Sequence, residues 1–423
     1  MSPPAIDLAL FERHESNVRY YSRIFPAVFD RAQGSELFAE DGRRWIDFFS
    51  GASALNYGHA PEAVIGAVVD YLRRGGILHA LDAATTAKGR FLEALHRYVL
   101  APRGLPYRVQ FCGPTGTDAV EAALKLARRI TGRTNVVAFS GSYHGKSLGS
   151  LAVSGGLSAR AAAGLPLAGT TFLPYFDGPE GPFDSVGLLR RLLMDPLGGV
   201  EPPAAVILES VQLEGGVYPA PAEALRALRA LCDAHGVLLI VDEIQSGCGR
   251  TGPFFAFERA GIVPDLVTVS KSIGGAGFPI SLVLLRQELD QWKPGEHTGT
   301  FRGHQLSFVA ATAALESFWA HGLTEEVEHK GRLVERTLRE RLVARAPEVR
   351  LRGSGLAWGV DFSSAGGGER VERILGRAFS QGLVVESCGR RGAVVKLTPP
   401  LTISEALLSE GLDVLLSATE TER

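Results

Sequence analysis

Two charged residues follow strongly apolar stretches of this 423-residue chain: Asp242 after Val237–Val241, and Lys271 after Pro264–Ser270. The first run is rich in β-branched residues, which is typical of a strand buried on both faces of a parallel sheet. Open α/β sheets bind ligands beyond the carboxyl ends of their strands, so both side chains can face one crevice. An acid and a lysine together suit a cofactor that the lysine holds as a Schiff base while the acid binds a protonated pyridinium nitrogen. The simpler alternative is that each is a solvated loop residue or part of a surface ion pair.

A longer pattern surrounds these two residues. The segments Val241–Gly252 (VDEIQSGCGRTG) and Ser270–Gly275 (SKSIGG) resemble those of the class III (ω-amino) pyridoxal-phosphate aminotransferases. The resemblance implies that Lys271 binds pyridoxal 5'-phosphate, that Asp242 keeps its ring nitrogen protonated, and that Gln245 contacts its phenolic oxygen. It also implies the α/β fold of a fold-type I transferase, in which a large domain has a mostly parallel central sheet. A smaller α+β domain is then built from the two ends of the chain.

A glycine-bearing turn lies between a predicted strand, Tyr107–Cys112, and a predicted helix that continues through Glu121–Arg128. Free backbone N–H groups and the helix dipole make such a turn an anion site, although a plain helix cap is the simpler interpretation. By resemblance, Thr115, Gly116 and Thr117 bind the cofactor phosphate. The resemblance also places the ring of Tyr143 on the pyridine face, where stacking contributes about 0.5–1.5 kcal/mol. His144 is a weaker candidate for this role.

Glu214, Leu213 and Lys396 are candidate substrate residues, and the last two differ from the usual family pattern. Glu214 matches a glutamate that in relatives pairs with an arginine and moves aside for a substrate carboxylate. Leu213 precedes it where glycine is usual, so we expect its side chain to narrow the pocket unless it packs inside the protein. Many relatives carry an arginine where this chain has Lys396, and lysine cannot make the same bidentate contact with a carboxylate.

The loop Glu296–Gly303 matches a loop whose threonine reaches the cofactor phosphate of the neighbouring subunit. By position this threonine is Thr300. The resemblance therefore implies a homodimer with shared active sites.

Within the family, the likeness is greatest to the diaminobutyrate aminotransferases. The stretches that carry it are Phe11–Arg19, Phe48–His59, Gly113–Thr117 and Gly299–Gly303. The implied reaction moves the terminal amino group of L-2,4-diaminobutyrate to 2-oxoglutarate, giving aspartate 4-semialdehyde and glutamate. Three alternatives stay open: an aminotransferase for ornithine, 4-aminobutyrate or another ω-amino acid, an aminomutase or decarboxylase of the same fold, and a binding protein without a cofactor.

Composition argues against several other classes of protein. The chain is 45% hydrophobic and 21% charged, and its net charge of −2 predicts neither nucleic acid nor an anionic membrane as a partner. Its four cysteines lack metal-ligand spacing, so we expect no metal site and reduced thiols, as in cytoplasmic proteins. The first residues do not resemble a signal peptide, and no apolar stretch is long enough to span a bilayer.

Turn signals and apolar periodicity predict the coarse organisation. The resemblance implies an N-terminal segment of the small domain at 1–60, a large cofactor-binding domain at 61–310 and a C-terminal small domain at 311–423. Glu40–Gly42 is the predicted turn of a β-hairpin. Predicted helices cover 61–73, 86–100, 306–320 and 323–346, and predicted strands cover 135–139 and 204–208. Gly366–Gly368 is predicted to be a surface loop.

Overall fold

A computed structural model describes residues 6–420 of the chain. A seven-stranded sheet has the order β4-β12-β11-β10-β7-β5-β6, and two four-stranded sheets have the orders β1-β2-β3-β15 and β13-β14-β17-β16. The strands are β1 (Phe29–Gln33), β2 (Glu36–Ala39), β3 (Arg44–Asp47), β4 (Tyr107–Phe111), β5 (Val136–Phe139), β6 (Thr170–Leu173), β7 (Ala205–Glu209), β8 (Val211–Gln212), β9 (Tyr218–Pro219), β10 (Leu238–Asp242), β11 (Leu266–Val269), β12 (Leu282–Arg286), β13 (Arg350–Ser354), β14 (Ala357–Asp361), β15 (Leu383–Val384), β16 (Glu386–Cys388) and β17 (Val394–Leu397).

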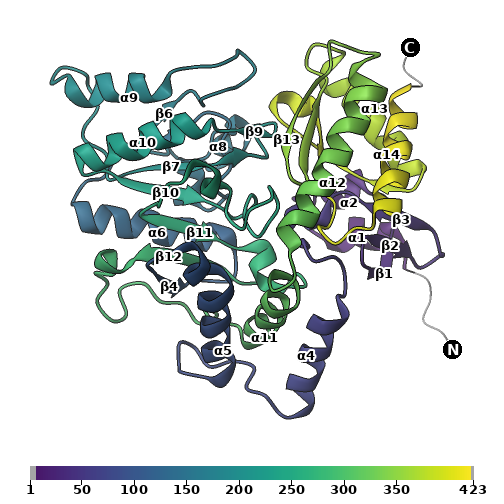
Figure 1. Ribbon diagram of the computed structural model, residues 1–423, viewed down its shortest axis with the longest axis horizontal. Coiled ribbons are helices and arrows are strands. Elements are labelled where there is room, and N and C mark those ends of the chain that lie inside the picture. The colour runs from purple at the N-terminus through teal and green to yellow at the C-terminus, as the bar shows by residue number, and fades with distance from the viewer. Residues whose placement is uncertain (1–5, 421–423) are drawn as a thin grey trace.

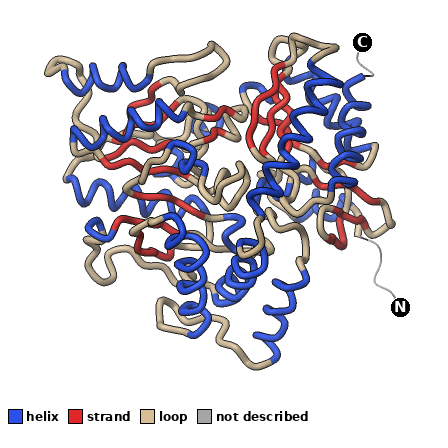
Figure 2. Tube along the Cα trace, in the orientation of Figure 1, coloured by secondary structure: helices blue, strands red, loops and turns tan. Residues whose placement is uncertain are grey.

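Helices cover the faces of these sheets (Figures 1 and 2). They are α1 (Leu8–His14), α2 (Tyr21–Ile24), α3 (Ser50–Ser53), α4 (Glu62–Arg73), α5 (Thr86–Leu95), α6 (Gly116–Thr131), α7 (Leu148–Ala152), α8 (Leu157–Ala161), α9 (Ser185–Met194), α10 (Ala222–His235), α11 (Gln305–Ala314), α12 (Leu323–Leu338), α13 (Gly367–Ser380) and α14 (Glu405–Glu420). Three of them, α5, α11 and α12, continue directly into π-helical turns, which end at Leu100, Trp319 and Val343.

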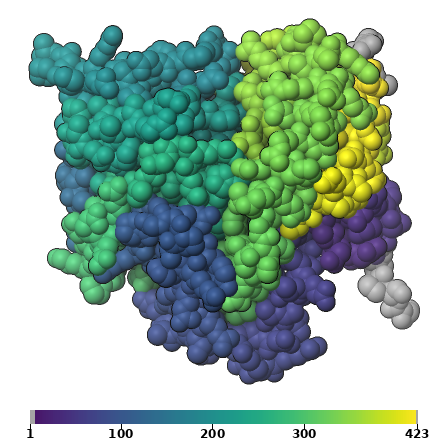
Figure 3. Space-filling view, in the orientation of Figure 1, coloured from purple at the N-terminus to yellow at the C-terminus, as the bar shows by residue number. Residues whose placement is uncertain are grey.

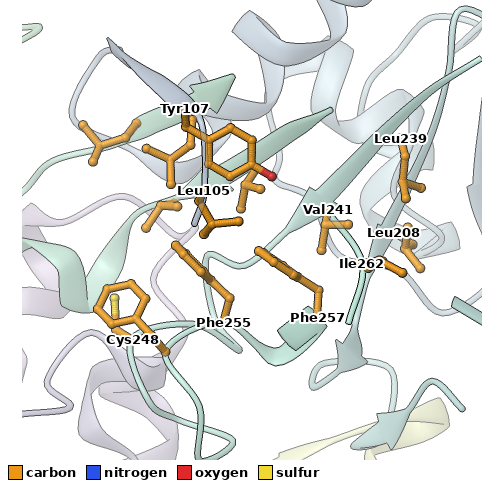
Figure 4. Close-up of a cluster of buried hydrophobic side chains, with 14 of the residues drawn as sticks. Leu105, Tyr107, Leu208, Leu239, Val241, Cys248, Phe255, Phe257 and Ile262 are labelled. Atoms are coloured by element: carbon orange, nitrogen blue, oxygen red, sulfur yellow. The ribbon is translucent and has the colours of Figure 1, made fainter. Parts of the chain in front are cut away.

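The large sheet is mostly parallel, as expected for this fold class. Strand β10 runs parallel to β7 and β11, and β5 runs parallel to β6 and β7, whereas β12 is antiparallel to both of its neighbours. Alternate residues of β10 enter different cores: Leu239 and Val241 pack on one face, and Ile240 packs on the other with α6. Figure 4 shows the first of these cores, where Leu239 and Val241 lie near Phe257. Burial on both faces explains why the strand is a continuous apolar run.

The two ends of the chain form the second half of the molecule. Strand β15, from the C-terminal part, pairs in parallel with β3 from the N-terminal part. Helix α14 (yellow) and the N-terminal segment (purple) lie side by side in Figures 1 and 3, and Arg44 contacts Glu410 across them. The strands of the large sheet all fall within residues 107–286. The boundaries at residues 60 and 310 stay a prediction.

Most of the predicted elements are present. The hairpin turn at Glu40–Gly42 connects the antiparallel strands β2 and β3, and the predicted helices correspond to α4, α5, α11 and α12 with their π-helical turns. The prediction for Gly366–Gly368 is wrong, because Gly367 and Gly368 begin α13. A Cβ atom at Gly368 would lie 2.0 Å from the carbonyl oxygen of Arg391, so this start of the helix has room only for glycine. Within residues 6–420, no helix is long and apolar enough to cross a membrane.

A buried arginine connects the two halves. Arg250 lies beyond the end of β10, and its guanidinium donates to the carbonyl oxygens of Leu356 and Pro399 at 2.9 and 2.6 Å and to Asn56 Oδ1 at 2.6 Å. The side chain is completely buried, and burial lowers its pKa to about 9 despite the opposing charge of Asp47. One cation therefore joins the large sheet to segments from both ends of the chain.

Candidate active site

A cavity of about 290 Å³ lies at the carboxyl ends of β7, β10 and β11. Its lining brings together most of the residues that the sequence singled out. They are Thr115, Gly116, Thr117, Tyr143, Asp242, Gln245 and Lys271. The expectation that these strand ends and turns share one crevice is confirmed.

Lys271 follows β11 and begins a short 3-10 helix, Lys271–Gly274. Its φ of +53° lies in the left-handed region, which is costly for a residue with a Cβ atom. Removal from bulk water lowers its pKa to about 8, although the negative charge of Glu214 acts in the opposite direction. At pH 7, about one molecule in ten then carries a neutral Lys271 amine, compared with about one in three thousand at the ordinary pKa. A nucleophile or base needs this neutral form.

Asp242 ends β10 and is almost fully buried. Its Oδ1 accepts from the backbone N–H of Ile244 at 3.1 Å, and its Oδ2 lies 2.7 Å from Nδ1 of His144. Glu209 ends the adjacent strand β7 directly opposite Asp242 and accepts from the N–H of Tyr143 at 3.0 Å. Burial and the charge of Asp242 hold the pKa of Glu209 well above its usual range. Of these two adjacent carboxyl groups, the one on Glu209 therefore favours its neutral form.

The start of α6 forms the opposite wall of the cavity. Thr115 donates its hydroxyl and its N–H to Asp118 Oδ2, at 2.8 and 3.2 Å, which fixes the first turn. The Oγ1 of Thr117 lies 2.6 Å from the hydroxyl oxygens of Ser147 and Ser150. A Cβ atom at Gly116 would lie 3.0 Å from Ile244, so the absence of a side chain keeps this edge open. An anionic group can bind here to free N–H groups at the positive end of the helix.

Tyr143 and Gln245 lie on the cavity between these walls. The Tyr143 side chain is 43% exposed, which leaves its ring free to cover a flat ligand. Nε2 of Gln245 donates to Oε1 of Glu214 at 3.0 Å. Gln245 thereby connects the cavity to a neighbouring group of charges that does not itself line the cavity.

That group consists of Glu214, Lys396 and Glu386. Nζ of Lys396 donates to Oε1 of Glu214 and lies 2.9 Å from Oε1 of Glu386. Burial would lower the pKa of Lys396, but the two carboxylates outweigh it and raise this pKa. Burial would likewise raise the pKa of Glu214, but Lys396 and Lys271 outweigh it and lower this pKa. Lys396 thus contacts the glutamate that the family pairs with an arginine.

Of the two orientations that the sequence leaves open for Leu213, the structure shows the packed one. Its side chain is completely buried and packs with Val211, Val217, Ala357 and Val394, away from the cavity. It therefore fills a contact between the β8–β9 hairpin and the β13–β17 sheet, and it is not among the residues that line the cavity. A substitution at Leu213 would therefore alter the packing of these side chains more than the access of a substrate to the cavity.

Thr300 lies outside the cavity, on an exposed loop. Its carbonyl oxygen is 2.9 Å from Nε2 of His79. Its predicted contact with a neighbouring subunit stays a prediction.

Two functional candidates, Glu209 and Glu386, lack a role in the sequence interpretation, and a third, His144, contacts Asp242 where the sequence suggested a weaker candidate for covering the ring. Glu209 ends an apolar strand just as Asp242 does, so the same signal could have identified it. The contact of His144 with Asp242 joins residues 98 positions apart, and Glu386 lies in the short strand β16. Only the three-dimensional structure shows these two partners.

The residues fit a flat pyridine cofactor that carries an aldehyde and a phosphate. The cavity offers an amine with a lowered pKa, a buried carboxylate, an aromatic ring and a helix N-terminus, each contributed by a different turn. Each of these groups matches one part of such a cofactor.

Comparisons with known proteins agree with this site. A family model described as aminotransferase class-III matches residues 18–419. The diaminobutyrate–2-oxoglutarate transaminase of Streptomyces anulatus is 52% identical over 98% of both chains. The enzyme of the same name from Streptomyces coelicolor is 50% identical over 97% of both chains.

Solved structures show the same fold. The ornithine aminotransferase of Toxoplasma gondii has a TM-score of 0.85 and 27% identity, covering 98% of this chain and 95% of that one. Another structure of that enzyme, with a TM-score of 0.84, contains pyridoxal phosphate at partial occupancy in its active site. The arrangement of Lys271, Asp242 and the N-terminus of α6, together with a family match over nearly the whole length, leads to one assignment. This chain belongs to the class III aminotransferases.

Proposed function

We propose that this enzyme transfers the terminal amino group of L-2,4-diaminobutyrate to 2-oxoglutarate, with pyridoxal 5'-phosphate as cofactor. The observation that carries the proposal is the cavity in which Lys271 and Asp242 face the N-terminus of α6. Identity near 50% to the diaminobutyrate–2-oxoglutarate transaminases supports this substrate pair. The ornithine aminotransferase is much less similar, at 27% identity.

Each cavity residue has a role in this reaction. The bound cofactor supplies an electron sink for the pair left when the C–H bond at the amine-bearing carbon breaks. Lys271 would hold the cofactor through its amine and, once freed, would move the proton at that carbon. Asp242 keeps the ring nitrogen protonated, and His144 holds this carboxylate in place. Thr115, Gly116 and Thr117 bind the phosphate, and Tyr143 covers the ring.

Glu214 and Lys396 act at the substrate end of the cavity, beyond Gln245. While they are paired, Lys396 is not free to bind a carboxylate, which suits a donor that reacts through its terminal amine. A 2-oxo acid brings a carboxylate, which requires Glu214 to release Lys396. One site can then accept both substrates in turn.

A panel of amine donors and oxo acceptors tests the proposed function. We expect product masses to show glutamate and aspartate 4-semialdehyde from diaminobutyrate and 2-oxoglutarate, with kcat/KM at least about tenfold above ornithine and 4-aminobutyrate. A preference for either of those amines would overturn the substrate assignment. Turnover without any 2-oxo acid would instead identify an aminomutase or decarboxylase.

We also propose a homodimer in which Thr300 completes the partner's site. The loop that carries Thr300 packs against residues 77–82: the rings of His79 and Phe301 are 5.4 Å apart, and Arg302 pairs with Asp82. Ile77, Leu78, Leu81 and Phe301 are each at least 50% exposed there, and such apolar patches mark protein interfaces. The four buried, unpaired cysteines suit a reducing compartment, so we place the dimer in the cytoplasm.

Thr300→Ala tests this shared site. We expect the parent to have the mass of a dimer in solution, and the variant to bind the cofactor about tenfold to a hundredfold more weakly, because a hydrogen bond to a charged group contributes about 1.5–3 kcal/mol. Equilibrium dialysis of the cofactor measures the change. Thr298→Ala, in the same exposed loop, is the matched control and should bind the cofactor like the parent. A monomeric parent with full activity would contradict the proposal.

A further inference from the structure

Lys396 has two carboxylate partners, and they come from different parts of the fold. Glu214 follows strand β8, whereas Glu386 lies on β16 directly opposite Lys396 in the antiparallel pair β16–β17. Directly opposite residues of such a pair point to the same face of the sheet. The Glu386–Lys396 contact is therefore fixed by strand pairing, whereas the Glu214 contact depends on the position of a loop.

The two carboxylates also differ in exposure. The side chain of Glu214 is 29% exposed, while those of Glu386 and Lys396 are 5% and 0% exposed. Glu214 can thus swing toward solvent, but Glu386 has no comparable way out. When Glu214 leaves, Lys396 remains beside one carboxylate.

We propose that Glu386 is a positioning residue for the acceptor half-reaction: it keeps Lys396 in place when Glu214 withdraws, and it takes up a proton when the carboxylate of a 2-oxo acid arrives at Lys396. This inference rests on the proposed transamination. It differs from the expected exchange of one carboxylate for another, because a third carboxyl group adjusts its charge.

Charge balance explains why Glu386 takes up a proton when the acceptor binds. With both glutamates ionised, the group of three has a net charge of −1, and the acceptor carboxylate makes it −2. Protonation of Glu386 removes one of these charges. Oε1 of Glu386 is buried and accepts no hydrogen bond of regular geometry, although Lys396 Nζ lies 2.9 Å away. Such an oxygen is poorly compensated as an anion.

The neighbouring titratable groups set the pH range over which Glu386 changes its charge. Burial raises the pKa of Glu386 to about 7; Lys396 and Lys271 oppose this shift and Glu214 adds to it. The other titratable groups that interact with this site are Tyr21 of α2, Tyr143, and Cys388 of the same strand. For each of these three, burial raises the pKa above its ordinary value, so they stay neutral near pH 7. Of the two glutamates that pair with Lys396, Glu386 then changes charge near pH 7; Glu243, whose pKa burial also raises to about 7, accepts from Ser246 outside this group, and Lys271 titrates near 8.

The test measures KM for 2-oxoglutarate from about pH 6.5 to 8.5 in the parent holoenzyme and in Glu386→Gln. Bound acceptor favours protonated Glu386, so its KM in the parent should rise with pH by up to about tenfold per unit. In Glu386→Gln, the plot of KM for 2-oxoglutarate against pH should lose its inflection near pH 7. At the highest pH, this KM should be about tenfold lower than in the parent. The inflection from Lys271 remains in both enzymes. KM for the amine donor is the internal reference and should change by less than about twofold.

Asp361→Asn is the matched control. Asp361 is a buried carboxylate of the same sheet and pairs with Arg352 at 2.9 Å, so the change removes a comparable ion pair elsewhere. We expect it to keep the parent's pH profile. The proposal is overturned if Glu386→Gln also keeps that profile, or if it shifts donor and acceptor KM alike, as a merely structural residue would.

A second measurement needs no variant. Calorimetric titration of the parent with 2-oxoglutarate at pH 7, in two buffers of different ionisation heat, should show uptake of a substantial fraction of one proton. Uptake below about a tenth of a proton would overturn the proposal even if Glu386→Gln failed to fold. An enzyme that binds 2-oxoglutarate with proton uptake but transfers no amine would contradict the proposed function and leave this inference standing.

Discussion

Lys271→Ala is expected to abolish steady turnover and to remove the visible absorbance of the lysine-bound cofactor. The cavity has a second lysine in its lining, Lys146, but its side chain is exposed and does not lie at the end of β11. Only Lys271 combines a strand-end position with a pKa lowered to about 8 by burial. Without its amine, the enzyme loses both the covalent attachment and the group that moves the proton.

Lys146→Ala is the matched control for this experiment. It removes an amine from the same cavity and should keep the absorbance and most of the turnover. A Lys271→Ala protein that retained both properties would disprove the assignment of Lys271. Absorbance spectra and steady-state rates of the two variants, recorded with excess cofactor, decide between these outcomes.

Asp242→Asn is expected to leave the fold intact and to reduce kcat by more than about tenfold, which is more than about 1.4 kcal/mol in the activation barrier. An amide of nearly the same shape can still accept from the N–H of Ile244, so β10 and the turn after it should keep their structure. A neutral amide cannot hold the proton on the ring nitrogen, and the ring then accepts electrons poorly. Circular dichroism and kcat measure the two parts of the prediction.

Glu209→Gln provides the comparison. Glu209 lies opposite Asp242 on β7, but its pKa is held well above the usual range, so an amide replaces a carboxyl group that already favours its neutral form. Its rate should stay within about tenfold of the parent. If the two substitutions had equal effects, the charge of Asp242 would have no special role.

The large sheet and much of the site could be predicted from the sequence because both depend on local patterns. Strand β10 is buried on both faces and is therefore an apolar run that ends at Asp242. Parallel strands align their carboxyl ends, so Asp242 and Lys271 had to meet at one edge. The turn before α6 has the glycine and threonines that an anion site needs. The roles of Gln245 and Tyr143 came from family resemblance, and their places on the cavity agree with it.

Side-chain direction outside regular strands could not be predicted. Leu213 lies in a loop, where no periodicity tells whether a residue faces the cavity or the interior, and the structure places it inside. Glu386 is one residue of a three-residue strand, and its importance arises from its pairing with Lys396. Gly367 and Gly368 have poor helix propensity, yet they begin α13: the backbone of Arg391 lies too close to Gly368 for any side chain, and the φ of +61° at Gly367 favours glycine.

Arg250 affects how this protein unfolds. Its charge lies in the interior and is shared among carbonyl oxygens beyond β13 and β17 and the amide of Asn56. Separating the large sheet from the two chain ends would break these three hydrogen bonds, and a hydrogen bond to a charged group contributes about 1.5–3 kcal/mol. Neither half can loosen independently without this penalty. We therefore expect the two halves to melt together in one cooperative transition, although each half has a core of its own.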